Sequence, residues 1–171
     1  MKKVMVGMSG GVDSSVAALL LRNQGYDVMG VTLKLFSDED IIQAENAQKT
    51  CCALSDVEDA RSVAYKLGFE HLVFNFKDNF KEYVMNQFAE SYLCGATPNP
   101  CIECNRHIKF DKMLRRAMEL EYDYIATGHY AINEYDESRK RYLLKRPADR
   151  SKDQTYVLYS LTQNQLAHTL F

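Results

Sequence analysis

The sequence predicts an α/β fold in which a parallel, twisted sheet carries helices on both of its faces. Short apolar patterns typical of strands alternate along the chain with longer patterns of helical period. Such alternation produces βαβ units, whose strands lie parallel in one sheet. The chain has 171 residues, 46% of them hydrophobic and 26% charged, which suits one globular domain with a buried core. We therefore treat residues 1–171 as a single domain.

Each predicted element rests on a local pattern. Apolar runs predict strands, and apolar residues three or four positions apart predict helices. Gly25 and Gly68 stop two of the helices, while Ser55 with Glu58 forms a capping box that opens one of them. The predicted elements are, in order, a strand over 2–7, a helix over 13–23, a strand over 26–36, a helix over 55–67, a strand over 71–76, helices over 79–93 and 105–120, a strand over 122–127 and a small β-hairpin near 130–146.

Three segments have weaker patterns. Residues 37–52 show no clean period and are expected to form a loop with room for one short helix. Residues 94–105 contain two prolines, a glycine and two asparagines, so no regular element is expected before Asn105, which can cap the next helix. Thr162 and Gln165 cap a last helix, which has barely begun when the chain ends at Phe171.

The loop after the first strand carries the clearest chemical signal. Residues 7–14 read GMSGGVDS, in which the glycines let backbone N–H groups approach an anion and the serines add hydroxyl donors at a helix start. The loop has neither the lysine of a Walker A motif nor the G-x-G-x-x-G spacing of a dinucleotide-binding loop. Asp13 beside a phosphate is explained by a Mg²⁺ ion between them. An ordinary strand-to-helix turn is the alternative, and the complete string favours a phosphate site.

Two further segments are expected to meet this loop. Ligands bind at the carboxyl ends of parallel strands, and the turn after residues 31–34 and the segment 127–130 both follow predicted strands. These segments and the loop over 7–15 should therefore converge on one site. His129 is either a functional donor there or a hydrogen-bonded structural residue.

The charges bear on the partners of the protein. The net charge of -2 argues against a protein that coats nucleic acid, yet residues 139–152 (RKRYLLKRPADRSK) hold seven Lys or Arg and one Asp. This stretch is either a solvated hairpin or a surface for nucleic-acid phosphates. No apolar run is long enough to span a membrane, and the N-terminus leads directly into a strand pattern, so we expect a cytoplasmic protein without a membrane partner.

The cysteines indicate sulfur or metal chemistry. Five cysteines stand at 51, 52, 94, 101 and 104, and an odd number in an intracellular setting argues against a disulfide framework. Cys101 and Cys104 form a C-x-x-C pair that can close a disulfide or supply two metal ligands. Cys104 precedes a predicted helix, a position that favours the thiolate. The alternative is a pair of surface thiols without a role, and Cys51 with Cys52 is a secondary metal candidate.

Taken together, the motifs resemble the MnmA family of tRNA-specific 2-thiouridylases. The resemblance is carried by GMSGGVDSSVAA, TPNPCIECNRHIKF, ATGHYA and KDQTYVLYSL, which span essentially the whole chain. The first of these strings resembles the PP-loop of ATP pyrophosphatases. The resemblance implies ATP and Mg²⁺ as cofactors and tRNA as the substrate. In that family ATP adenylates the C2 oxygen of the wobble uridine, and sulfur from a persulfide donor protein displaces AMP to give 2-thiouridine.

The resemblance also implies roles for single residues. Cys104 matches a catalytic cysteine that resolves the sulfur transfer. Cys101 holds a position that is Asp in many members, which leaves open a redox pair or part of an iron–sulfur site. ATP would contact Gly7, Met8, Ser9, Gly10, Gly11, Val12, Asp13, Ser14, Leu33 and Gly128. The tRNA would contact Asn99, Pro100, Cys101, Lys152, Asp153 and Gln154.

Family members continue past the position of Phe171 with a second catalytic cysteine and a β-rich tRNA-binding region. The chain is therefore expected to bind ATP, to bind tRNA weakly and not to thiolate tRNA catalytically by itself. Two other readings remain: an iron–sulfur-dependent PP-loop thiolase or ligase, and a non-catalytic ATP- and tRNA-binding fragment.

Overall fold

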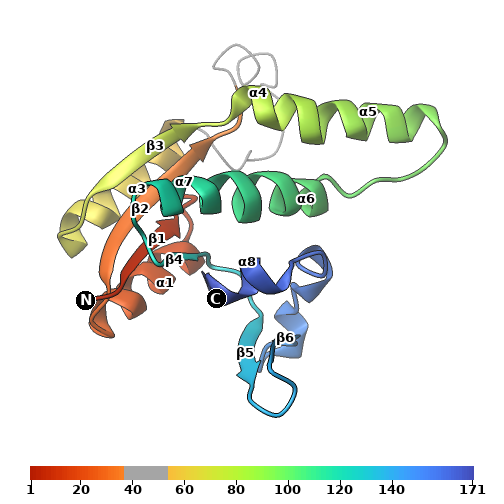
Figure 1. Ribbon diagram of the computed structural model, residues 1–171. Coiled ribbons are helices and arrows are strands. Elements are labelled where there is room, and N and C mark those ends of the chain that lie inside the picture. Colours follow the sequence, from red (N-terminus) through yellow and green to blue (C-terminus); the bar gives the residue numbers. More distant parts are fainter. Residues whose placement is uncertain (37–53) are drawn as a thin grey trace.

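The computed structural model describes residues 1–36 and 54–171, so the predicted loop over 37–52 lies outside the described residues. Its central feature is a parallel five-stranded sheet in the order β3-β2-β1-β4-β7 (Figure 1). The strands are β1 (Lys3–Gly7), β2 (Asp27–Lys34), β3 (His71–Asn75), β4 (Tyr124–Ala126) and β7 (Thr169–Leu170). Because the strand order reverses at β1, a crevice is expected at the carboxyl end of that strand.

Helices cover both faces of the sheet, as predicted. On one face, α1 (Val12–Asn23) and α3 (Leu54–Leu67) bury Ala18 and Ala60 against Val4 and Val6 of β1. On the other face, Met5 packs in a second cluster that includes Phe110 and Met113. Successive residues of β1 therefore enter different halves of the core, which is the side-chain alternation of a strand buried on both sides.

Two long helical runs lie side by side on the second face (Figure 1). The first comprises α4 (Lys77–Phe80), the π-helical η1 (Lys81–Met85) and α5 (Asn86–Leu93). The second comprises α6 (Pro100–Glu103), the π-helical η2 (Cys104–Met113) and α7 (Leu114–Glu119). In the second run, the side chain of Gln165 donates to the carbonyl oxygen of Phe110 at 2.8 Å and so satisfies one backbone group of the wider π-helical turn.

The predicted start of the second run was wrong. The helix begins at Pro100 rather than after Asn105, because the side chain of Asn99 caps it by accepting the N–H of Cys101 at 3.0 Å. Proline is well suited to the first helical position, where its missing N–H is not needed. Cys101 and Cys104 therefore lie on a helix and not on an irregular loop.

Three smaller features complete the fold. Helix α3 already includes Leu54, so Ser55 lies within its first turn and not at the predicted N-cap. The capping box of Thr162 and Gln165 is present, but α8 (Gln163–Ala167) ends early and β7 follows it, which the sequence did not predict. The hairpin of β5 (Ile132–Asp136) and β6 (Arg141–Lys145) is confirmed, and short 3₁₀ turns follow it at Arg150–Lys152 and Thr155–Val157. Among the described residues, no helix is long and apolar enough to cross a membrane.

Candidate nucleotide-binding site

A cavity of about 240 Å³ opens at the carboxyl edge of the sheet. The three segments that were expected to converge all line it, together with two residues of η2 and one residue before the last 3₁₀ turn. Its lining residues are Gly7, Met8, Ser9, Asp13, Ser14, Val31, Thr32, Leu33, Leu35, Lys109, Met113, Thr127, Gly128, His129 and Gln154.

The glycine loop has the geometry of an anion cradle. Gly11 is the N-cap of α1 and no side chain caps that helix, so the N–H groups of its first turn have no capping side chain in front of them. Gly10 has φ +75°, and a Cβ there would lie 2.6 Å from the carbonyl oxygen of Asp56. The hydroxyls of Ser14 and Ser15 both donate to the carbonyl oxygen of Gly11, at 3.2 and 2.9 Å, and so hold the loop in shape.

Gly128 brings the turn after β4 against this loop. A Cβ on Gly128 would lie 2.7 Å from the backbone nitrogen of Ser14 and 2.8 Å from the carbonyl carbon of Asp13. The turn and the start of α1 are thus in direct backbone contact. Of the predicted ATP-contacting residues, Gly7, Met8, Ser9, Asp13, Ser14, Leu33 and Gly128 line the cavity, whereas Gly10, Gly11 and Val12 shape the loop without lining it.

The opposite wall is mainly apolar and comes from β2 and η2. Val31, Leu33 and Leu35 alternate with polar Thr32, whose hydroxyl donates to the carbonyl oxygen of Met8 at 2.9 Å. Met113 adds a flexible apolar side chain. This wall could accept a flat, largely apolar ring.

His129 and Lys109 add two nitrogen-bearing side chains to the lining of the cavity. His129 Nδ1 lies 2.7 Å from the Thr127 hydroxyl, and its ring packs near Phe110 and Phe171 at centroid distances of 5.9 and 6.3 Å. Burial, with a smaller effect from the charge of Lys109, lowers the pKa of His129 to about 3. His129 is therefore neutral at pH 7 and is both a cavity residue and a structural one.

This pKa has a measurable consequence for stability. Between pH 6.5 and 3 the unfolded chain binds a proton at His129 that the folded chain does not, so the free energy of unfolding should fall on acidification. The contribution of His129 should reach about 1.4 kcal/mol per pH unit in that window. Urea unfolding at pH 7, 6 and 5 should therefore show a shallower pH dependence for His129→Gln than for the wild type, since both retain every carboxylate. Equal slopes for the two proteins would contradict the lowered pKa of His129.

Asp13 is held by a residue that the sequence did not single out. The Tyr130 hydroxyl donates to Asp13 Oδ1 at 2.8 Å and accepts from Lys152 Nζ at 3.4 Å. The contact with Tyr130, and less strongly the charge of Asp13, raises the pKa of Lys152. Of the predicted tRNA-contacting residues 152–154, Gln154 lines the cavity and Asp153 forms an ion pair with Arg146 at 3.2 Å.

The cysteines lie on the helical run that also reaches the cavity. Cys101 is exposed and Cys104 is buried in the core cluster of η2. Cys104 lies beyond the first turn of the helix, so the expectation that it stands at a helix start was wrong. The structure does not bring Asn99, Pro100 or either cysteine into the lining of the cavity, although Lys109 and Met113 of the same run do line it.

The described part of the chain contains no cluster of metal-binding side chains. Across residues 1–36 and 54–171, no three His, Cys, Asp or Glu side chains gather closely enough to bind an ion. Cys51 and Cys52, the secondary candidates, lie outside the described residues. His107 and Arg106 instead contact Glu103, at 3.2 and 3.3 Å.

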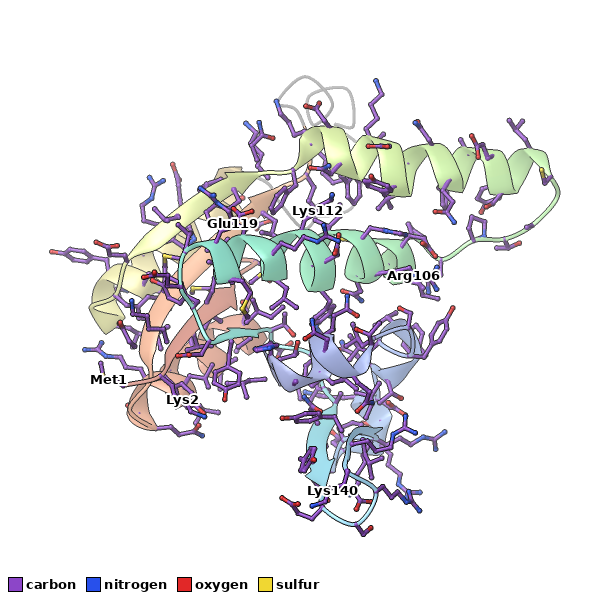
Figure 2. All side chains as sticks on the ribbon, viewed as in Figure 1. Met1, Lys2, Arg106, Lys112, Glu119 and Lys140 are labelled. Carbon is purple, nitrogen blue, oxygen red and sulfur yellow. The ribbon has the colours of Figure 1, made fainter. Side chains whose placement is uncertain are left out.

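The basic stretch over 139–152 is partly neutralised by its own neighbours. Four of its seven cations form ion pairs with carboxylates at 2.8 to 3.6 Å: Arg139, Lys140, Lys145 and Arg146. Arg141 and Arg150 are exposed, and no ion pair joins them to another described residue. The stretch lies on the hairpin that carries Lys140 and on the turn after it (Figure 2).

Together, the strand order and the glycine loop define an α/β domain with a PP-loop at the carboxyl edge of its sheet. The chain belongs to the family described as the tRNA methyl transferase HUP domain, whose model matches residues 2–171. It is 59% identical over 169 residues to "tRNA-specific 2-thiouridylase MnmA 1" of Thermoanaerobacter pseudethanolicus, which covers 99% of this chain and 46% of that protein. It is 60% identical to "tRNA-specific 2-thiouridylase MnmA" of Clostridioides difficile, with the same coverage.

These comparisons confirm the resemblance that the motifs indicated. The chain spans about half the length of the curated relatives that it matches. Among solved structures, a predicted subunit of a tRNA methyltransferase from Methanocaldococcus jannaschii matches with a TM-score of 0.50 and 22% identity, over 74% of this chain and 53% of that one. This likeness supports the fold alone.

Lys109 and Met113 were missing from the sequence-based site, whereas Thr127 and Tyr130 lay in a segment expected there but were given no role. Lys109 is flanked by Ile108 and Phe110, both buried, and a lysine between two core residues was a usable signal that the helix faces a polar cavity. Tyr130 gave no such signal, because its partner Asp13 is 117 residues away in the sequence.

Proposed function

We propose that this domain binds ATP and adenylates the C2 oxygen of the wobble uridine of tRNA, as the first half of 2-thiouridine synthesis. The observation that carries the proposal is the single cavity in which the PP-loop, the end of β2 and the turn at Gly128 meet. The identity to proteins named as tRNA-specific 2-thiouridylases supports this choice among the reactions that a PP-loop can serve.

The residues present fit a nucleoside triphosphate. Val31, Leu33 and Met113 offer an apolar wall for adenine, and the loop and first turn of α1 offer N–H groups for phosphate oxygens. Lys109 supplies from η2 the positive charge that a Walker A loop would carry itself. Asp13 would hold Mg²⁺, which when bound neutralises charge on the phosphates.

The chemistry then divides between two parts of the molecule. The C2 oxygen attacks the α-phosphorus and pyrophosphate leaves, while the loop and Lys109 stabilise the charge that develops on the phosphate oxygens. Sulfur from a persulfide donor protein displaces AMP in the second half. We assign Cys104 to this half as the resolving thiol, with Asn99, Pro100 and exposed Cys101 beside the incoming base. Because Cys104 is buried, it must be uncovered before it reacts.

The test is pyrophosphate release from Mg·ATP in the presence of tRNA. Release should require a tRNA with uridine at the wobble position, and a matched transcript with cytidine there should give only the background rate. Equal release with both transcripts, or none with either, would overturn the proposal. We further propose that residues 1–171 supply the ATP-binding portion alone, so multiple-turnover 2-thiouridine formation should need the remaining half of a longer relative to be added.

Three cations of the basic stretch lack ion pairs, and two of them, Arg141 and Arg150, also lack the contact with Tyr130 that Lys152 makes. These two arginines should contribute to tRNA binding. Replacing Arg141 and Arg150 together by Glu should weaken tRNA binding and reduce the salt dependence of log K by roughly two units, about one per phosphate contact. Lys140→Glu is the matched control, because Lys140 already pairs with Glu137 at 2.9 Å. Filter binding between 50 and 200 mM salt measures the slope. An unchanged slope in the double variant would make this stretch a solvated surface.

A further inference from the structure

We propose that Tyr130 is a positioning residue that couples tRNA binding at Lys152 to the affinity of the PP-loop for Mg·ATP. The inference rests on the proposed function and adds regulation to the same site. It is built on a chain of contacts that runs from Lys152 through the Tyr130 hydroxyl to Asp13.

The backbone of Tyr130 is fixed to the segment that carries Lys152. The N–H of Tyr130 donates to Gln154 Oε1 at 3.0 Å, and the N–H of Gln154 donates to the carbonyl oxygen of Tyr130 at 3.2 Å. Two reciprocal hydrogen bonds make the turn after β4 and residues 152–154 move together. A displacement of that segment by a bound RNA would therefore reach the Tyr130 side chain.

Tyr130 lines a groove next to the nucleotide cavity, and the Asp13 that it holds lines both. A groove of about 760 Å³ runs beside the nucleotide cavity, contains Tyr130 and Lys152, and shares Asp13, Gly128 and His129 with that cavity. Lys152 Nζ also lies 4.8 Å from the centre of the Tyr130 ring. A ligand in the groove can thus contact Tyr130 and Lys152 directly, whereas a ligand in the cavity reaches Tyr130 through Asp13.

The charges give the coupling its sign. Without RNA, Lys152 lies over the Tyr130 ring, and its positive charge attracts the carboxylates of Asp13 and Asp149. An RNA phosphate that draws Lys152 away removes that cation from the surroundings of Asp13. The carboxylate then attracts Mg²⁺ more strongly, while the Tyr130 hydroxyl keeps it oriented. Binding of tRNA should therefore tighten binding of Mg·ATP, and Mg·ATP should tighten binding of tRNA by the same factor.

Tyr130→Phe tests the inference because it removes one hydroxyl and keeps the ring. The dissociation constant of Mg²⁺ with α,β-methylene-ATP, which does not release pyrophosphate, is measured without and with saturating tRNA. In the wild type, we expect tRNA to lower this dissociation constant by about five-fold or more, which is the lower range of typical coupling. In Tyr130→Phe and in Lys152→Met, the ratio of the dissociation constants without and with tRNA should lie within about two-fold of one. The double variant should lose no more of this coupling than either single variant.

Tyr65→Phe, on the exposed face of α3, is the control and should keep the wild-type factor. A wild type that binds both ligands with no coupling, or a Tyr130→Phe variant with the wild-type factor, would overturn the inference and leave the proposed function intact. A wild type that binds no Mg·ATP would instead overturn the proposed function. The two failures are therefore distinguishable, and Lys152→Met provides a second variant if Tyr130→Phe does not fold.

Discussion

Gly128→Ala is expected to abolish measurable ATP binding and to destabilise the folded protein. The added Cβ would lie 2.7 Å from the backbone nitrogen of Ser14 and 2.8 Å from the carbonyl carbon of Asp13. Both atoms belong to the backbone, so no side-chain rotation can relieve the contact. Either the turn after β4 or the first turn of α1 must move, and Ala18 and Leu21 fix α1 in the core.

The displaced turn carries the N–H groups proposed for the phosphates, so ATP affinity should fall at least about 100-fold, since positioned donors lose their effect with shifts of about 1 Å. Overpacking should lower the free energy of unfolding by about 1–3 kcal/mol. Calorimetric titration with Mg·ATP and urea unfolding measure the two effects. Gly11→Ala is the control for stability, because its Cβ would meet nothing nearer than 3.5 Å. Wild-type affinity in Gly128→Ala would refute the role of this backbone contact.

Asp13→Asn is expected to reduce tRNA-dependent pyrophosphate release by about 100-fold or more while leaving the fold intact. The substitution keeps an oxygen that can accept from the Tyr130 hydroxyl, which now lies 2.8 Å away, and removes only the charge proposed to hold Mg²⁺. A loss of this size is typical when one group that stabilises the developing charge is removed.

The matched control is Asp111→Asn. In the wild type, the Asp111 carboxylate forms an ion pair with Arg115 at 2.8 Å, and neither residue lines the cavity. That variant should release pyrophosphate at the wild-type rate, because an exposed pair of this kind contributes less than about 1 kcal/mol. Stopped-flow detection of pyrophosphate over a range of Mg²⁺ concentrations would make the distinction. If Asp13→Asn turned over like Asp111→Asn, Asp13 would have no part in the reaction.

The parts of the fold that could be predicted are those in which a local pattern and the tertiary structure agree. The run from Lys3 to Gly7 is apolar on both faces because β1 is the central strand. The loop after it turns because of its own glycines, which the sequence shows directly. The strand β7 could not be predicted, since its two residues are strand only because they pair with β4. Its neighbour α8 was predicted from a cap that acts within four residues.

The errors at the cysteine segment have a similar cause. Pro98 and Pro100 in one short stretch indicated an irregular loop, but proline at a helix start is favourable once Asn99 caps it. The π-helical turns of η2, which direct Lys109 and Met113 to the cavity, have no sequence pattern of their own. The roles of Tyr130 and Lys109 depend on partners from other elements, so these roles can be recognised only in the folded structure.

The position of β1 in the middle of the sheet also determines when the protein can first fold during its synthesis. One edge of β1 can pair early with β2, but the other edge pairs with β4, which is made much later. The N–H of Lys3, for example, donates to the side chain of Asp123, which lies 120 residues further along the chain. At about 5–20 residues per second, a ribosome needs roughly 6–24 s to make that interval. During this time the nascent chain exposes an unpaired strand edge, the feature by which chains most readily associate. The proposed binding of ATP would not protect this edge, because the cavity also needs Gly128 and Gln154, which are made after Asp123.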